Sequence, residues 1–288
     1  MRSPIQPLAA AVLGLGVTGA LHAQVAYTRA GQSYTQGFDT LATSGSGNAW
    51  ANDTTLPGWS LFRVTSNSDA TPTAIATYNA GTGSGNSGAF FSFGSSGSSE
   101  RALGGLGSGT AYFGGGSGSA ALASGVTVGW ITLGLRNDTG GAIAGFTLGF
   151  DGEQWRDGGA STPNAQTLGF EYGFGSTFGG VPSWTDPGAA FHFSSPVFQN
   201  TSNGAAVDGN GVGRTSGLGG TVSGVDWEPG ETLWLRWTER NDTGSDHGLA
   251  IDDVAFSAVP EPEEYAAIAG AGMAAVAWWR RRRGVPRS

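Results

Sequence analysis

The chain of 288 residues contains no cysteine and no lysine, and only three histidines. Without cysteine no disulfide can form, so a hydrophobic core alone must stabilise the fold. One of the three histidines, His22, lies at the end of the N-terminal apolar stretch, which leaves too few for a histidine-based metal cluster. Charged residues make up 12% of the chain, whereas glycine accounts for 52 residues. This scarcity of helix formers beside so much glycine favours an all-β fold.

Arginine supplies all 14 basic residues, against 22 acidic residues, so the formal net charge is −8. Between residues 24 and 260 the sequence holds 8 arginines and 19 acidic residues, a net charge of about −11. A surface this acidic repels nucleic acids and anionic lipids, so we expect no nucleic-acid partner. It is compatible with neutral polysaccharide, with cationic partners or with calcium.

The last thirty residues carry three features in order. Pro260-Glu261-Pro262 cannot continue a helix, so it is expected to form an extended, exposed segment. An uncharged apolar run from Tyr265 to Trp279 follows, and then Arg280-Arg281-Arg282-Arg283. As a helix this run would span ~22 Å, less than the ~30 Å of a bilayer's hydrocarbon core, so its terminal aromatics would have to lie at the interfaces. The arginines are expected to stay on the cytoplasmic side.

This order of features resembles the PEP-CTERM sorting signal, which we assign to residues 259–288. The resemblance implies that an exosortase, a membrane protease or transpeptidase, removes the tail near Pro260-Glu261-Pro262. It also implies an association with bacteria that produce exopolysaccharide. A plain single-pass membrane anchor is the alternative interpretation.

The N-terminus fits the same export route. Arg2 precedes an apolar stretch from Leu8 to Val17, which predicts a signal peptide at residues 1–23, cleaved by signal peptidase after Ala23 or Ala20. Residues 24–258 are then expected outside the cytoplasm as one domain. The expected location is the bacterial cell surface or extracellular matrix, after transient anchoring in the inner membrane by the C-terminal helix.

Short segments of alternating apolar and polar residues recur between turns rich in Gly, Ser, Asn and Asp. This pattern predicts a mostly antiparallel β-sandwich of jelly-roll type. No fixed repeat period is present, which argues against a β-solenoid. Residues 200–220, rich in Gly and Asn, are expected to form a loop.

Two β-hairpins are predicted. The first joins strand Val126–Arg136 to a strand through Phe146 and Phe150, by a turn at Asn137-Asp138-Thr139-Gly140. The second joins the strand beginning at Leu233 to Gly248–Phe256. Both turns contain the sequence Arg-Asn-Asp-Thr-Gly, which is most simply explained by shared turn chemistry.

The pair Asp252-Asp253 is the most informative internal feature. Strand alternation puts one of these carboxylates on a mostly apolar face, unless a β-bulge intervenes. A buried carboxylate needs a cation or several hydrogen-bond donors. Three interpretations remain open: a calcium ion, a salt bridge to an arginine such as Arg236, or simple exposure.

Ile251-Asp252-Asp253-Val254 resembles the final strand of jelly-roll sandwiches of the concanavalin, MAM and carbohydrate-binding type. The resemblance implies a structural calcium between the first and last strands, with Asp39 as a further ligand beside Asp252 and Asp253. It covers a few residues directly and the rest of the chain only by its strand pattern.

Glu153-Gln154-Trp155-Arg156 is the second candidate site. A glutamate beside an aromatic ring could lie in a sugar-binding groove, and Glu153 with Glu171 could supply the two carboxylates of a glycoside hydrolase. A surface pair of Glu and Arg beside a turn is the simpler interpretation.

The remaining motifs are weaker. Asp208-Gly209-Asn210-Gly211 begins like a calcium-binding loop but lacks its later ligands, so it is expected to be a turn. Catalysis by Ser, His and Asp lacks the Gly-x-Ser-x-Gly turn that marks many serine hydrolases. The sequence therefore predicts a non-catalytic binding or structural module associated with exopolysaccharide. A secreted glycan hydrolase that uses Glu153 and Glu171 is the alternative, and a purely structural coat protein is a third hypothesis.

Overall fold

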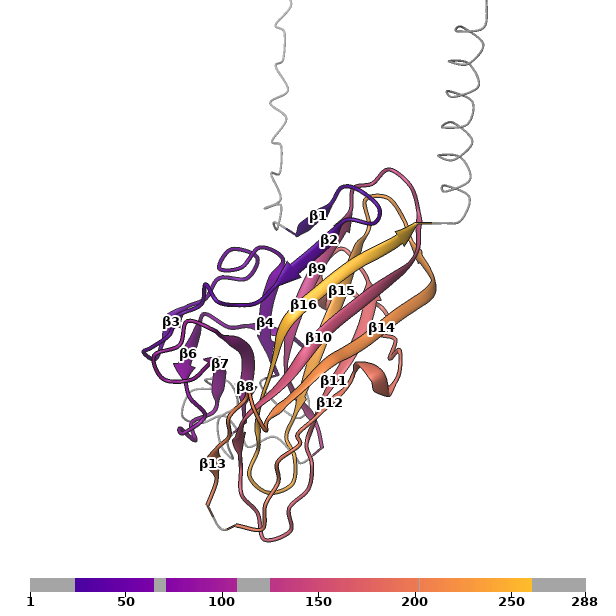
Figure 1. The fold of residues 1–288 in the computed structure, drawn as a ribbon. Helices are drawn as coiled ribbons and strands as arrows, with labels where there is room; N and C mark the ends of the chain where they lie inside the picture. Colours follow the sequence, from indigo (N-terminus) through magenta and orange to yellow (C-terminus); the bar gives the residue numbers. More distant parts are fainter. Residues whose placement is uncertain (1–23, 65–70, 108–124, 202, 261–288) are drawn as a thin grey trace, which may run out of the picture.

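The protein is a β-sandwich of two mixed, mainly antiparallel sheets (Figure 1). The computed structural model describes residues 24–64, 71–107, 125–201 and 203–260. Two short 3-10 turns, η1 (Phe178–Gly180) and η2 (Ala189–Phe191), are the helical elements of this part of the chain. The predicted all-β sandwich is confirmed.

The first sheet has seven strands, of which six form a continuous path. In spatial order they are β12 (Phe193–Ser194), β11 (Thr167–Phe174), β15 (Thr232–Arg240), β9 (Thr127–Asn137), β4 (Trp59–Arg63) and β5 (Thr73–Ala74). The seventh, β1 (Val25–Tyr27), pairs in parallel with β9.

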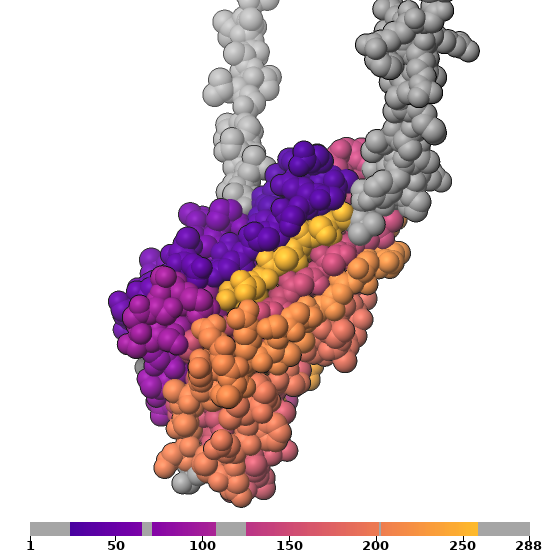
Figure 2. Space-filling model, in the orientation of Figure 1, coloured from indigo at the N-terminus to yellow at the C-terminus, as the bar shows by residue number. Residues whose placement is uncertain are grey.

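The second sheet has nine strands, of which seven form a path. In spatial order they are β13 (Ala205–Ala206), β10 (Ile143–Asp157), β16 (Gly248–Pro260), β8 (Ala102–Leu106), β7 (Ala89–Phe93), β6 (Thr77–Gly81) and β3 (Asn48–Ala49). In addition β14 (Arg214–Trp227) pairs with β10, and β2 (Ser33–Gln36) pairs with β16. On the surface, β16 forms a stripe between β2 and β10 (Figure 2).

The main core fills the space between the two sheets. Apolar side chains at alternate positions of the longer strands point into it, as the sequence pattern predicts. Trp237 lies near its centre and is fully buried. Its ring stacks on Trp59 at 5.7 Å between centroids and meets Phe150 and Phe170 edge-on at 5.5 and 5.3 Å. Aromatic pairs of this kind stabilise a fold beyond the area that they bury.

A second, smaller cluster lies on the other face of the nine-stranded sheet. Phe91, Phe93 and Trp155 belong to it, together with Ala89, Ala102, Leu106 and Ala250. The rings of Phe93 and Trp155 are nearly parallel, at 6.2 Å between centroids. Part of this outer face is therefore covered and apolar.

The two predicted hairpins are wrong, although their strands are correct. β9 and β15 belong to the seven-stranded sheet, whereas β10 and β16 belong to the nine-stranded one. Each Arg-Asn-Asp-Thr-Gly turn, at residues 136–140 and 240–244, therefore carries the chain from one sheet to the other. Alternation alone shows which face of a strand is apolar, but a hairpin and a crossing between facing sheets bury that face equally well.

The Gly-rich segment 200–220 is only partly a loop. β13 and the first half of β14 fall within it, and β14 runs on to Trp227. β14 lies at an edge of the sheet and needs few apolar side chains. Its many glycines therefore leave little of the alternation that predicts a strand.

Most of the predicted export signals lie outside the described residues. These are the signal peptide at residues 1–23, Glu261 and Pro262 of the sorting motif, the apolar run 265–279, and the arginines 280–283. Pro260 is described and ends β16. Within the described ranges no helix is long and apolar enough to cross a membrane.

Candidate functional site

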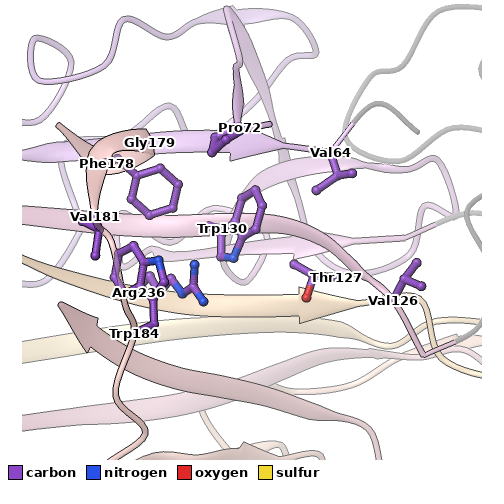
Figure 3. Close-up of a pocket in the computed structure, with 10 residues that line it drawn as sticks. All are labelled: Val64, Pro72, Val126, Thr127, Trp130, Phe178, Gly179, Val181, Trp184 and Arg236. Atoms are coloured by element: carbon purple, nitrogen blue, oxygen red, sulfur yellow. The ribbon is translucent and has the colours of Figure 1, made fainter. Parts of the chain in front are cut away.

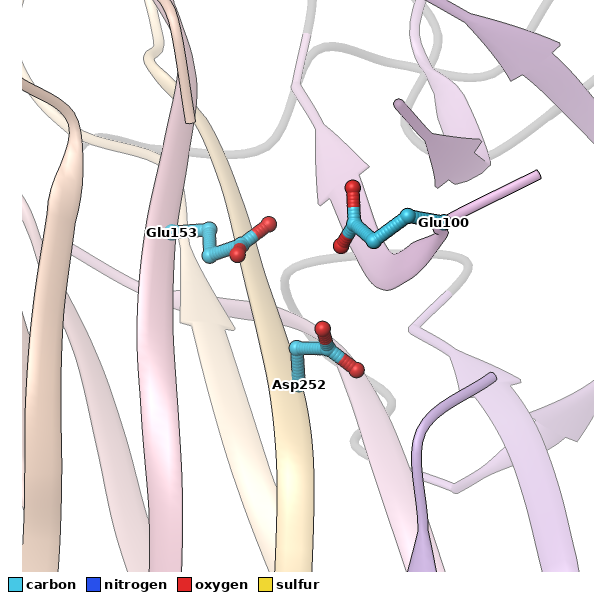
Figure 4. Close-up of side chains that lie close together, drawn as sticks. All are labelled: Glu100, Glu153 and Asp252. Carbon is cyan, nitrogen blue, oxygen red and sulfur yellow. The ribbon is translucent and has the colours of Figure 1, made fainter. Parts of the chain in front are cut away.

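Three carboxylates converge on the covered outer face of the nine-stranded sheet (Figure 4). Glu153 comes from β10, Asp252 from β16, and Glu100 from the segment between β7 and β8. One oxygen of each lies within 4.8 Å of one oxygen of each of the others. We call these three residues the acidic triad.

A β-bulge in β16 explains why Asp252 joins the triad. Gly149 pairs with Ala255 and Asp151 pairs with Asp252, so β16 has one residue more than β10 over this stretch. Asp253 adopts a positive φ of 48° at the bulge and its side chain is exposed. Because of the extra residue, Ile251 and Val254 both face the main core while Asp252 faces the outer side.

Two members of the triad are deeply buried, and Glu100 is partly exposed. Glu153 is fully buried and Asp252 is only 4% exposed. One oxygen of each member, Glu100 Oε1, Glu153 Oε1 and Asp252 Oδ1, has no hydrogen-bond partner among the described residues. Burying a carboxylate oxygen without a partner is strongly unfavourable. Burial raises the pKa of Glu153 to about 7, and burial together with the neighbouring Glu153 and Asp253 carboxylates raises the pKa of Asp252 well above its ordinary value.

Hydrogen bonds fix the other oxygens of the two glutamates. Trp155 Nε1 donates to Glu153 Oε2 at 2.9 Å, and Asn210 Nδ2 donates to Glu100 Oε2. The segment that carries Glu100 is also held by Arg101, which is 1% exposed and whose Nε donates to Ser92 Oγ at 2.8 Å. These contacts hold the free oxygens toward one another, so the triad could hold a metal ion.

The neighbouring arginines pair with other carboxylates. Arg214 forms salt bridges with Asp151 and with Asp253, the second at 2.9 Å. Arg236, the arginine that the sequence singled out, lies on the other sheet and pairs with Glu171. Of the three interpretations of Asp252-Asp253, an arginine pair and exposure therefore describe Asp253, whereas Asp252 is buried in the triad.

Asp39 and Asp253, the other two residues predicted as metal ligands, lie close to the triad but outside it. A Cβ atom added at Gly37 would lie about 4 Å from Oδ2 of Asp39 and from Oδ1 of both Asp252 and Asp253. Asp39 Oδ1 accepts a hydrogen bond from the backbone N–H of Arg101 at 3.0 Å. Asp39 thus braces the segment that carries Glu100.

The structure does not bring Glu153 and Glu171 together. Glu153 points outward from the nine-stranded sheet, while Glu171 points outward from the seven-stranded one and pairs with Arg236. The main core therefore lies between the two carboxylates. Stacked sheets lie ~10 Å apart, and two groups on their outer faces are farther apart than the 5–10 Å that glycoside hydrolysis requires.

An aromatic hollow of about 520 Å³ opens on the outer face of the seven-stranded sheet (Figure 3). Trp130 of β9 and Arg236 of β15 form part of its floor, and Phe178 and Trp184 come from the segment after β11. The guanidinium carbon of Arg236 lies 3.8 Å from the centre of the Trp184 ring. The remaining lining residues are Val64, Pro72, Val126, Thr127, Gly179 and Val181.

Glycine allows the segment after β11 to lie on the sheet and wall the hollow. A Cβ atom at Gly173 would lie 2.6 Å from the carbonyl oxygen of Ser183, closer than real side chains approach. Phe178 also lines a second hollow of about 310 Å³, together with Phe62 and Trp234. No local pattern in the sequence predicts this surface, because its rings come from four separate segments.

A serine, a histidine and an aspartate meet at another place. His247 Nδ1 lies 2.9 Å from Ser195 Oγ, and His247 Nε2 lies 3.4 Å from Asp157 Oδ1. All three residues are no more than 5% exposed, and Ser195 Oγ already accepts a hydrogen bond from the backbone N–H of Gln166 at 2.9 Å. This arrangement resembles a hydrolytic triad in composition, but its buried hydroxyl is engaged in holding two loops together.

Residues 208–211 form a turn, as expected. The backbone N–H groups of Gly211 and Gly213 donate to the Asp208 carbonyl oxygen at 3.1 and 2.9 Å. A Cβ atom at Gly209 would lie 2.3 Å from the Trp155 ring, so this turn packs directly on the second cluster. Glu100 was not among the predicted site residues, because it lies in a Gly- and Ser-rich stretch without a recognisable pattern.

Comparisons with protein-family models, with curated proteins and with solved structures give no match for this chain. The geometry of the described residues is therefore the basis for any functional argument.

Proposed function

We propose that the chain is an exported, non-catalytic β-sandwich module that binds neutral exopolysaccharide in a bacterial extracellular matrix. The observation that carries this proposal is the aromatic hollow on the seven-stranded sheet. Binding sites for small polar molecules combine apolar and aromatic walls with a few placed polar groups. Here Trp130, Phe178 and Trp184 provide the walls.

The polar groups of the hollow suit hydroxyl ligands. Arg236 donates to Glu171 Oε2 at 2.8 Å, and this pairing neutralises its charge. The guanidinium still has further N–H donors. Thr127 contributes a hydroxyl. None of the ten described lining residues is acidic, although the domain as a whole carries a net negative charge. A neutral glycan avoids the repulsion that an anionic one would meet.

The same features favour binding over hydrolysis. No pair of carboxylates faces this hollow in the described part of the chain, and Glu153 is buried beneath the opposite face. Two-carboxylate hydrolysis needs both groups beside one bound sugar. A binding module requires only the aromatic walls of the hollow and its hydrogen-bond donors.

Export remains part of the proposal. Signal peptidase would release the N-terminus after Ala23 or Ala20, and an exosortase would process the chain at Pro260-Glu261-Pro262. The jelly-roll relationship to concanavalin-like, MAM-like and carbohydrate-binding modules is proposed on the same footing. It is supported by the pairing of β2 with β16, which puts an N-terminal strand beside the last one.

We further propose Ca²⁺ as a structural cofactor, held by the acidic triad. Only oxygen ligands converge there, and hard cations such as Ca²⁺ prefer oxygen. The burial of Glu153 and Asp252 suits an ion that stabilises the fold and does not contact a substrate.

Affinity electrophoresis of residues 24–258 tests the function. Gels would contain a neutral β-glucan, a neutral galactomannan or anionic alginate. We expect retention by at least one neutral polysaccharide. Trp184→Ala and Arg236→Gln should each weaken binding about tenfold, equal to about 1.4 kcal/mol.

Phe198→Ala is the matched control, because Phe198 is an aromatic residue that is 43% exposed and does not line the hollow. Near-ultraviolet circular dichroism verifies that each variant is folded. Failure of the folded domain to bind any neutral polysaccharide, or equal binding by the hollow variants and the control, would refute the proposal.

A further inference from the structure

We propose that a Ca²⁺ ion in the acidic triad clamps the segment between β7 and β8 onto the nine-stranded sheet, and that Trp155 reports whether the ion is bound. The inference rests on the structural calcium of the proposed function and assigns it a place, a mechanical role and a spectroscopic signal. It does not depend on polysaccharide binding.

The three ligands come from parts of the chain that are far apart in sequence. Glu153 and Asp252 lie on neighbouring paired strands, whereas Glu100 lies on a connecting segment outside any strand. An ion bound by all three would therefore tie this connecting segment to the centre of the sheet. Without the ion, three carboxylates face one another, and the nearby Arg214 and Arg101 form no salt bridge with them among the described residues.

Free, buried oxygens distinguish this cluster from an ordinary group of surface acids. Each residue directs one oxygen without a hydrogen-bond partner toward the others, and Glu153 and Asp252 are at least nine-tenths buried. Trp155 and Asn210 occupy the remaining glutamate oxygens, so the free ones cannot turn away without breaking those bonds. The fixed orientation points to a ligand.

The ligand type favours calcium. Ca²⁺ binds six to eight oxygens at about 2.3–2.6 Å in flexible geometry. The oxygens of the triad lie within 4.8 Å of one another, close enough for one ion to bind all three. Mg²⁺ demands regular octahedral geometry and usually keeps several bound waters, which suits a buried group of carboxylates less well. The absence of nitrogen and sulfur ligands in the triad disfavours zinc.

Trp155 couples the ion to the second cluster. Its Nε1 donates to Glu153, and its ring lies parallel to Phe93. Gly209 packs against the same ring close to Nε1, and the adjacent Asn210 bonds to Glu100. Binding of Ca²⁺ would therefore hold the connecting segment, the turn 208–211 and the indole of Trp155 in one arrangement.

Terbium luminescence tests the site directly, because Tb³⁺ replaces Ca²⁺ and emits light when a nearby tryptophan is excited. We expect sensitised emission from the wild-type domain that Ca²⁺ abolishes in competition and that Mg²⁺ reduces far less. In Trp155→Phe most of this emission should disappear, while calorimetry still detects Ca²⁺ binding. Loss of the nearest indole alone would produce that result.

Ligand variants locate the ion. Glu153→Gln and Asp252→Asn should each weaken Ca²⁺ binding about tenfold or more, because each removes one charged ligand. Glu171→Gln, a carboxylate paired with arginine on the other sheet, is the matched control and should bind Ca²⁺ as the wild type does. Near-ultraviolet circular dichroism identifies any variant that has failed to fold.

Hydrogen exchange tests the clamp. Saturating Ca²⁺ should slow exchange of the amides in residues 94–101 in the wild type and in Glu171→Gln, but not in Asp252→Asn. A folded wild-type domain that shows no displaceable terbium emission would overturn the site. Calcium binding that leaves exchange in residues 94–101 unchanged would overturn the clamp.

Discussion

Without calcium the domain should lose stability as the pH rises from about 4.5 to 7, because of Glu153. Burial raises the pKa of this carboxyl from 4.5 to about 7 in the folded protein. Between these two values the folded state binds more protons than the unfolded state, so the free energy of unfolding falls as the pH increases. The contribution of Glu153 is complete below pH 4.5 and is lost as the pH passes through 7.

The size of the effect follows from the shift. A pKa raised from 4.5 to about 7 corresponds to about 3 kcal/mol between the two ends of this pH range. For a domain of this length, roughly 2–4 °C in Tm accompany each kcal/mol, so the loss amounts to about 6–12 °C. Asp252, whose pKa is also raised, adds a loss of the same sign that extends to higher pH.

Urea unfolding of residues 24–258 with a chelator, at pH values from 5 to 8.5, measures this slope. Glu153→Gln should make it shallower, because glutamine fills the same space without a proton to lose, and Asp252 and Asp246 account for the slope that remains. Excess Ca²⁺ should restore the stability at pH 8, by about 2.7 kcal/mol when its concentration is a hundred times Kd. A wild-type slope identical to that of Glu153→Gln would refute the reasoning, and so would stability that rises between pH 5 and 7.

Three further predictions concern other parts of the fold. Ser195→Ala should lower the free energy of unfolding by about 1–3 kcal/mol in urea titrations, because the backbone N–H of Gln166 loses its acceptor in a buried place. Asp246→Asn should raise stability at pH 8 by up to about 4 kcal/mol with little effect at pH 4, since burial raises the pKa of Asp246 to about 7; equal effects at both pH values would contradict this. Gly104→Ala should lower the Tm in calorimetry by at least several degrees, because its Cβ would lie 2.2 Å from the Leu249 carbonyl oxygen.

The sequence predicted the strands and their faces much better than their partners. Ile131, Leu133 and Leu135 lie in the core, and so do Leu233 and Trp237, at the alternate positions that the apolar pattern marks. These assignments succeed because the side chains of a strand alternate between its two faces wherever the strand lies. Pairing depends on residues distant in sequence, so the two crossings between sheets were mistaken for hairpins.

The candidate site was predicted only in part, because it too depends on contacts between residues distant in sequence. Asp252 and Glu153 were identified separately, by their apolar surroundings and by an adjacent tryptophan. That they meet depends on the pairing of β10 with β16 and on the one-residue bulge at Asp253. The alternation pattern shows that a bulge would change the facing of these aspartates, but it does not show where a bulge occurs. Glu100 is brought in only by the packing of the segment between β7 and β8.

The distribution of arginine is a further argument for an ion in the acidic triad. Arg214 pairs with Asp151 and Asp253, and Arg236 pairs with Glu171. Arginine thus compensates carboxylates on both sheets, yet none of the salt bridges of the described residues reaches the triad, where burial makes an unpaired charge most unfavourable. A cation bound from outside the chain would neutralise the triad as arginine neutralises the other carboxylates.

The proposed export would bring the domain to a compartment that can supply this cation. Calcium sites of extracellular modules commonly have Kd values of about 10⁻⁴–10⁻³ M, far weaker than those of cytosolic sensors. A triad of three carboxylates with such an affinity would stay empty inside the cell, where its mutual repulsion loosens the segment around Glu100, and would fill after secretion. The proposed export route and the proposed clamp therefore support each other: the domain would reach its full stability only in the compartment where it is expected to bind polysaccharide.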